Sequence, residues 1–163
     1  MEKTVRFDQF QHLVDQVAGG NAHGAGIKPG QMHPLALAYI GDAFFTLYVR
    51  TRLLSYEPNR VRVLHAFGSK IVSAAVQAAA LRSLEMELTE EEKAVVRRGR
   101  NAKSTPTKNA SVSDYRYSTG LEALLGYLFL TGEENRLEEL AEKVFNAAMR
   151  KITDSPKDEG EKQ

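Results

Sequence analysis

The chain has 163 residues, of which 42% are hydrophobic and 26% are charged, so it is long enough to bury one hydrophobic core but hardly two. No uncharged apolar run approaches the roughly 18 residues that a membrane span needs, and the first residues lack the apolar stretch of a secretory signal. The absence of cysteine excludes disulfides, thiolate metal sites and cysteine catalysis. We therefore expect one globular domain, no membrane association and a cytoplasmic location.

The formal net charge is only +1, but the charges are unevenly distributed along the chain. Residues 50–118 carry thirteen Lys or Arg against seven Asp or Glu, whereas residues 133–163 carry six against nine. Between residues 97 and 118 a single acid, Asp114, accompanies six basic side chains: Arg97, Arg98, Arg100, Lys103, Lys108 and Arg116. This concentration favours a phosphate-binding surface, and a solvated basic loop is the alternative.

The first 30 residues have the pattern of an N-terminal extension. Apolar side chains at near-helical spacing, among them Phe7, Phe10, Leu13 and Val17, permit a short amphipathic helix over residues 4–18. Five of the twelve glycines then fall between residues 19 and 30, which is typical of a flexible linker.

Two long helices are expected next. Residues 34–54 begin with Pro34 at a favourable first-turn position and carry apolar side chains on every face, which predicts a central buried helix. Residues 59–86 place apolar side chains three or four apart, which predicts a long amphipathic helix with a break near Gly68.

Three more helices complete the expected domain. Thr89 and Glu92 form a capping-box pattern that should begin a helix ending at about residue 98. The polar segment 99–113 predicts a loop that is longer than most connections in compact domains, and such loops are often functional. A nearly all-apolar helix over 119–130, ending at Gly132, and an amphipathic helix over 136–152 should precede a disordered tail, 153–163. No run alternates in the manner of a strand, so the predicted class is all-α, a helical bundle.

Two carboxylates stand alone in these apolar helices. Asp42 is the only acidic or basic residue between Pro34 and Val49, and Glu122 is the only one between Leu121 and Thr131. A buried charge requires a partner, and adjacent glycines allow a second helix to approach closely. If the two helices pack together, the carboxylates could share Mg²⁺ or Mn²⁺, which prefer oxygen ligands. The alternative is that each acid pairs with an arginine or lies exposed at the surface.

Three ordered segments resemble the ribonuclease III family, and specifically its mini-ribonuclease III branch. The segments are His33-Pro34-Leu35-Ala36-Leu37-Ala38-Tyr39-Ile40-Gly41-Asp42-Ala43, then Arg97-Arg98-Gly99-Arg100-Asn101-Ala102-Lys103, and finally Tyr115-Arg116-Tyr117-Ser118-Thr119-Gly120-Leu121-Glu122-Ala123-Leu124-Leu125-Gly126-Tyr127-Leu128. The resemblance covers about residues 31–152, the expected catalytic domain. Only residues 153–163 follow the last expected helix, so we expect no separate domain for binding double-stranded RNA.

The resemblance implies a homodimeric endoribonuclease that cuts both strands of an RNA duplex. Asp42 and Glu122 would be the catalytic residues and the ligands of Mg²⁺, with Mn²⁺ as a substitute, and the products would carry 5′-phosphate and 3′-hydroxyl ends. The RNA-binding residues would be Arg97, Arg98, Arg100, Asn101, Lys103, Lys108 and Arg116. The implied substrate is precursor large-subunit (23S) ribosomal RNA, and the resemblance leaves open a ribosomal protein as an additional partner.

The acidic set is smaller than that of the larger family. Full-length members carry glutamates four and seven residues before the aspartate and an aspartate three residues before the distal glutamate, where this chain has Ala38, Leu35 and Thr119. The main alternative function is a non-catalytic RNA- or ribosome-binding protein with the same helices. Loss of one acid would mark such a protein, and this chain retains both.

Overall fold

The computed structural model of the protein describes residues 28–106, 108 and 110–154. By compactness the chain divides into two units, Met1–Gln31 and Met32–Gln163. In the first unit the described part contains a short 3-10 helix, η1 (Pro29–Gln31). The helix expected over residues 4–18 lies outside the described residues.

The second unit is helical throughout its described part. It contains α2 (Pro34–Leu54), α3 (Val61–Ile71), α4 (Ala74–Leu84), the 3-10 helix η2 (Glu85–Glu87), α5 (Glu90–Asn101), α6 (Val112–Thr131) and α7 (Glu134–Asp154). No strand occurs among the residues described. The predicted all-α class is therefore confirmed.

Helix α2 has the predicted bounds but a different environment. His33 caps its start, because the imidazole Nδ1 accepts a hydrogen bond from the Leu35 amide at 3.1 Å. Leu37, Phe45 and Val49 are buried, but Tyr39 and Leu47 on the opposite side are 79% and 65% exposed. The predicted central buried helix is therefore buried on one side only, since apolar residues on every face do not distinguish a core face from an exposed one.

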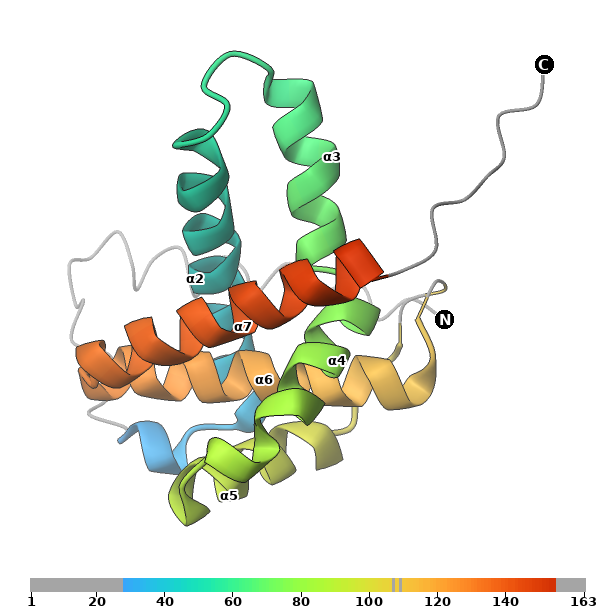
Figure 1. Cartoon of the computed structure of the whole chain (residues 1–163). Helices are drawn as coiled ribbons and strands as arrows, with labels where there is room; N and C mark the ends of the chain where they lie inside the picture. Colours follow the sequence, from blue (N-terminus) through green and yellow to red (C-terminus); the bar gives the residue numbers. More distant parts are fainter. Residues whose placement is uncertain (1–27, 107, 109, 155–163) are drawn as a thin grey trace, which may run out of the picture. The chain divides into compact units, whose positions relative to one another are not determined.

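The long helix expected over residues 59–86 is divided into α3 and α4, whose axes differ by 52°. The break lies at Val72 and Ser73, not near Gly68. Gly68 is an ordinary helical residue that faces the side chains of Leu53 and Val49. Figure 1 shows α2 and α3 side by side as a hairpin, with α7 crossing in front of α6.

Each of the remaining helices was expected from the sequence, but their first or last residues differ from the prediction. The capping box of Thr89 and Glu92 is present, and Gly132 ends α6 in the left-handed conformation with φ of 75°. α6 starts at Val112 instead of residue 119, because its first turns are polar and give no apolar signal. With α5 reaching Asn101, the loop shortens to residues 102–111, and α7 extends through Thr153 and Asp154, which were expected in the tail.

Helix α6 lies at the centre of this packing, in contact with α2, α4, α5 and α7. Its approach to α5 is closest at Gly99 and Gly120, where a Cβ atom on Gly99 would lie 2.8 Å from the Gly120 Cα. A buried ion pair joins α5 to α7, since Glu92 accepts hydrogen bonds from Arg136 Nε at 2.8 Å and from a terminal guanidinium nitrogen at 2.9 Å. These contacts fix α5 against α6 and α7.

Within the described ranges, no single helix is both long and apolar enough to cross a membrane. Only α3 taken together with α4 and η2 has sufficient length and apolar character, and this pair is bent.

Candidate active site

The two lone carboxylates meet where α2 crosses α6. A Cβ atom on Gly41 would lie 1.7 Å from the carbonyl oxygen of Glu122, and one on Gly126 would lie 1.9 Å from the carbonyl oxygen of Leu37. The backbones can approach this closely only because both positions are glycine. Asp42 follows Gly41 directly, and its carboxylate lies near enough to that of Glu122 to raise its pKa. The condition set by the sequence analysis, that the two acid-bearing helices pack together, is met.

The electrostatics of Glu122 reflect both burial and this neighbour. The pKa of the Glu122 carboxyl is raised from 4.5 to about 8, mainly by burial and secondarily by the negative charge of Asp42. A hydrogen bond from the side chain of Gln77 opposes the shift. Glu122 is partly buried, whereas Asp42 is exposed to solvent.

Neither acid has an arginine or lysine ion-pair partner in the described part of the chain. The alternative that each acid pairs with an arginine is therefore wrong for these residues, although Asp42 does lie at the surface. Two adjacent carboxylates without a cation favour the uptake of one, because a divalent ion would relieve their mutual repulsion.

The donor set fits magnesium better than a metal that requires a complete protein cage. The described residues contain no group of three or more His, Asp or Glu side chains that could enclose a metal. Two carboxylates are nevertheless sufficient for Mg²⁺, which retains several waters and is usually bound through one or two carboxylates and substrate phosphates. Asp42 and Glu122 are thus a chemically suitable pair of magnesium ligands.

The sequence analysis missed Gln77, a residue of α4. Its side chain is only 1% exposed and lies near enough to Glu122 to lower the pKa of that carboxyl. Only one signal could have pointed to it: Gln77 is a polar residue in the apolar segment from Ala74 to Leu81.

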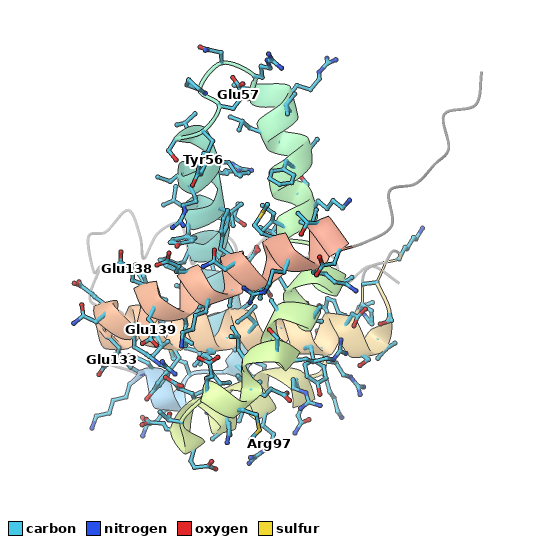
Figure 2. The ribbon with its side chains drawn as sticks, in the orientation of Figure 1. Tyr56, Glu57, Arg97, Glu133, Glu138 and Glu139 are labelled. Carbon is cyan, nitrogen blue, oxygen red and sulfur yellow. The ribbon has the colours of Figure 1, made fainter. Side chains whose placement is uncertain are left out.

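The expected RNA-binding residues lie on α5, the following loop and α6, but they do not form one uniform surface. Six of them are exposed: Arg97, Arg98, Asn101, Lys103, Lys108 and Arg116. Successive residues of a helix are separated by about 100°, so the arginines of α5 point to different sides. Arg97 projects from the outer face of α5 (Figure 2), whereas Arg98 lies near enough to Tyr127 to affect its pKa.

Arg100 points to the other flank of α5 and stacks on an aromatic ring. Its guanidinium lies 4.0 Å from the centre of the Tyr117 ring, and that of Arg82 lies 4.2 Å from the same ring. Arg82 also donates hydrogen bonds to Asp114 and Ser113, each at 3.0 Å. The sequence analysis did not include Arg82 in the basic region, because it is 15 residues earlier in the chain.

Two glutamates of α7 form ion pairs with nearby basic side chains. Glu139 pairs with Arg136 and Lys143, and Glu142 pairs with Arg52. Figure 2 shows Glu138 and Glu139 on α7, far from Arg97 in this view.

Comparison with known proteins identifies the family of this chain. A sequence model described as the Ribonuclease III domain matches residues 35–133. A Mini-ribonuclease 3 from Thermoanaerobacter is 48% identical over 112 residues, covering 68% of this chain and 79% of that protein, and one from Clostridium tetani is 44% identical over 133 residues, covering 80% and 85%. A crystal structure of a Fusobacterium nucleatum protein superposes with a TM-score of 0.64 at 27% identity, covering 69% of this chain and 91% of that chain. The chain therefore belongs to the ribonuclease III family, in its mini-ribonuclease III branch.

Proposed function

We propose that this endoribonuclease cleaves double-stranded RNA with the help of Mg²⁺ held by Asp42 and Glu122. The observation that carries the proposal is the crossing at Gly41, which places two carboxylates together without a protein cation to neutralise them. Mn²⁺, which accepts the same oxygen ligands, should substitute. The products would carry 5′-phosphate and 3′-hydroxyl ends.

Asp42 and Glu122 would have different roles, because one is exposed and the other is partly buried. When bound, the magnesium ion would activate a water and stabilise the negative charge that develops on the scissile phosphate. Asp42, exposed on α2, would approach the RNA most directly. Glu122, with a pKa of about 8 in the metal-free protein, would release a proton when it becomes a ligand.

The basic side chains would hold the RNA backbone. Phosphate contacts position a duplex without reading its sequence, and the deep major groove of A-form RNA is hard for side chains to reach. The exposed cations of α5 and of the loop, together with Arg116, supply such contacts from several directions. Arg100 and Arg82 are held in place by the Tyr117 ring and could contribute oriented guanidinium groups.

A homodimer is the assembly that best accounts for the outer face of α2. Tyr39, Asp42, Leu47 and Leu54 are exposed and follow one another at three- to seven-residue spacing along one side of the helix. Exposed apolar stripes of this kind mark interaction surfaces. A two-fold contact along the stripe would cover the apolar residues and bring Asp42 to the edge of the interface, where two copies could face one RNA duplex.

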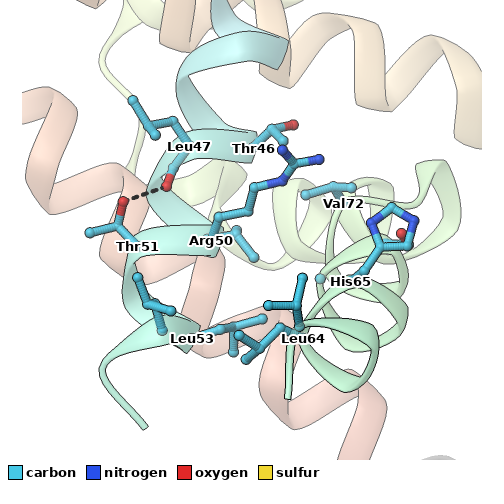
Figure 3. A pocket seen from close by; sticks show the side chains of 13 residues that line it. Thr46, Leu47, Arg50, Thr51, Leu53, Leu64, His65 and Val72 are labelled. Atoms are coloured by element: carbon cyan, nitrogen blue, oxygen red, sulfur yellow. Dashed lines mark hydrogen bonds between the residues drawn. The ribbon is translucent and has the colours of Figure 1, made fainter. Parts of the chain in front are cut away.

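A neighbouring groove extends the same surface. It has a volume of about 410 Å³ and lies between α2 and α3, with Leu47, Leu53 and Leu64 among its apolar lining residues and Arg50 and His65 among its polar ones (Figure 3). At the far end of the α2–α3 hairpin, Tyr56 is 76% exposed (Figure 2). A second copy of the chain would bury these side chains.

The sequence by itself also favours a dimer, because the first core helix carries more apolar side chains than one compact domain can easily cover: Leu35, Tyr39, Phe44, Phe45 and Tyr48. The structure shows that this set is wrong in part. Phe45 is only 1% exposed and belongs to the core of its own subunit, and Phe44 and Tyr48 are half-buried, each within 6.3 Å of another aromatic ring centre. The proposed contact depends instead on Tyr39, Leu47 and Leu54.

The proposed biological substrate is precursor 23S ribosomal RNA, cleaved in the cytoplasm, with a ribosomal protein as an additional candidate partner. Support comes from the resemblance to mini-ribonucleases. The distinguishing experiment incubates the purified protein with a perfect RNA duplex, a single-stranded RNA of the same sequence and a DNA duplex, each with Mg²⁺ or with a chelator. Cleavage of the RNA duplex alone, and only with Mg²⁺, is expected. Binding without cleavage would favour the non-catalytic alternative.

A further inference from the structure

Gln77 is an unusual residue for the inside of this domain. Its side chain is 1% exposed, and its Oε1 atom has no hydrogen-bond partner in the described part of the protein. An unpaired buried acceptor is unfavourable, so a position that served packing alone would be better filled by an apolar side chain. Filling space in the core therefore does not explain why this buried position carries an amide.

The nitrogen end of the same amide points to a backbone carbonyl. Nε2 donates a hydrogen bond of 2.7 Å to the carbonyl oxygen of Val72, at the bend between α3 and α4. The same side chain lies near enough to the carboxylate of Glu122 on α6 to lower its pKa. Gln77 thus lies between the backbone at the bend and one acid of the candidate site.

We propose that Gln77 is a positioning residue that holds the Glu122 carboxylate beside Asp42 for the binding of a divalent cation. The inference rests on the proposed function, since it concerns the same site. Among the described residues, Gln77 is the one side-chain donor that acts on the pKa of Glu122, so its removal would leave no other such donor to restrict the rotation of that carboxylate. Partners that orient metal ligands in this way commonly change metal affinity by 10- to 100-fold, about one or two orders of magnitude, when they are removed.

The test compares Gln77→Met with a structural control. Methionine has a similar length and shape but no amide, so it retains the packing and removes the polar group beside Glu122. Val76→Ala truncates the neighbouring buried residue of α4, which projects about 100° away from Gln77 around the helix axis, and it therefore measures the effect of weakening the helix alone. Thermal melting of both variants reports the fold.

Metal binding is measured on the RNA-free protein by titration with Mn²⁺, with free Mn²⁺ followed by electron paramagnetic resonance, and by competition with Mg²⁺. We expect Gln77→Met to bind Mn²⁺ about tenfold more weakly than the wild type, and Val76→Ala to bind it unchanged. Raising the Mg²⁺ concentration should restore most of the duplex cleavage by Gln77→Met but none of that by Glu122→Gln, because the first variant lacks only the support of the ligand.

The outcomes separate this inference from the proposed function. If the wild type neither binds Mn²⁺ nor cleaves duplex RNA, the proposed function fails. If the wild type does both and Gln77→Met has the same Mn²⁺ affinity, only the role of Gln77 is overturned. Gln77→Asn, which keeps an amide but is shorter by one methylene, should weaken binding in the same direction. If Gln77→Met and Gln77→Asn both fail to fold, the role of Gln77 is packing and the inference is overturned.

Discussion

The backbone of Gly41 lies directly against the carbonyl oxygen of Glu122, and a Cβ atom on Gly41 would be 1.7 Å from that oxygen. No side chain fits there without separating α2 from α6. Since Asp42 and Glu122 are carried by these two helices, the same contact that packs the core also brings the acids together.

Gly41→Ala should therefore destabilise the protein strongly, by about 3 kcal/mol or more, because the obstructing atoms are backbone. Gly68→Ala is the matched control: it is also a helical glycine, but its Cβ would make ordinary contacts, 3.6 Å from Leu53 Cδ1. It should be neutral or stabilising by up to about 1 kcal/mol, through the higher helix propensity of alanine. Urea unfolding of both variants measures the difference. Equal stability of the two would contradict the close crossing.

Asp42→Asn and Glu122→Gln should each abolish Mg²⁺-dependent cleavage while the protein remains folded, because the amide retains the shape of the acid and loses the charge that attracts the cation. The metal-free variants should be as stable as the wild type or more so, because Glu122→Gln replaces an acid whose charged form is disfavoured by burial, and Asp42→Asn removes the negative charge beside it. Cleavage assays and melting curves check both statements. Full activity in either variant would refute the catalytic assignment, and a melting temperature ten degrees lower would indicate a structural salt bridge.

The pH dependence of stability should report the pKa of Glu122. The folded, metal-free protein holds the carboxyl proton up to about pH 8, whereas the unfolded chain releases it near pH 4.5. The folded state therefore binds more protons between these values, and its stability should fall as the pH rises from about 4.5 to 8. Each pKa unit corresponds to about 1.4 kcal/mol, so the total loss is on the order of a few kcal/mol.

Denaturant unfolding at several pH values, with a chelator present, measures this slope. Glu122→Gln should remove most of it, and Asp42→Asn should reduce it, because the charge of Asp42 contributes to the shift. An unchanged slope in Glu122→Gln would show that another group is responsible.

Replacing Arg98, Arg100 and Lys103 together by alanine should weaken the binding of duplex RNA and make its salt dependence shallower. Each basic side chain that neutralises a phosphate releases counterions when the RNA binds, so its loss reduces the slope of log affinity against log salt. Arg150→Ala, which removes an exposed charge from α7, should leave the slope unchanged. If the triple variant has the wild-type slope, the basic segment is a solvated surface and does not bind RNA.

Sedimentation at micromolar concentration should give about twice the 18.1 kDa mass of one chain. Leu47→Glu should shift the protein towards the monomer, because it places a charge on the exposed stripe of α2 without disturbing the core. Glu138→Lys, on the exposed surface of α7, is the control for a change of charge elsewhere. A wild-type mass near 18.1 kDa would refute the dimer, and a stable Leu47→Glu dimer would move the interface to another face.

Much of this protein can be predicted from local sequence patterns. The bounds of α2, the capping box of Thr89 and the left-handed Gly132 were all correct, because such features depend on a few neighbouring residues. The sequence also identified Asp42 and Glu122 through their isolation in apolar helices. That isolation is a property of the chain and needs no three-dimensional information.

Only the tertiary structure decided how these pieces are arranged. The bend at Val72 and Ser73, the exposed stripe containing Tyr39 and Leu47, and the polar first turns of α6 depend on which faces the other helices cover. Packing between helices that are distant in the sequence brings Gln77 near Glu122 and Arg82 onto the ring of Tyr117. Local propensity and spacing fix a helix and its caps, but burial is a property of the assembled core, and it alone determines which polar residue lies against an acid.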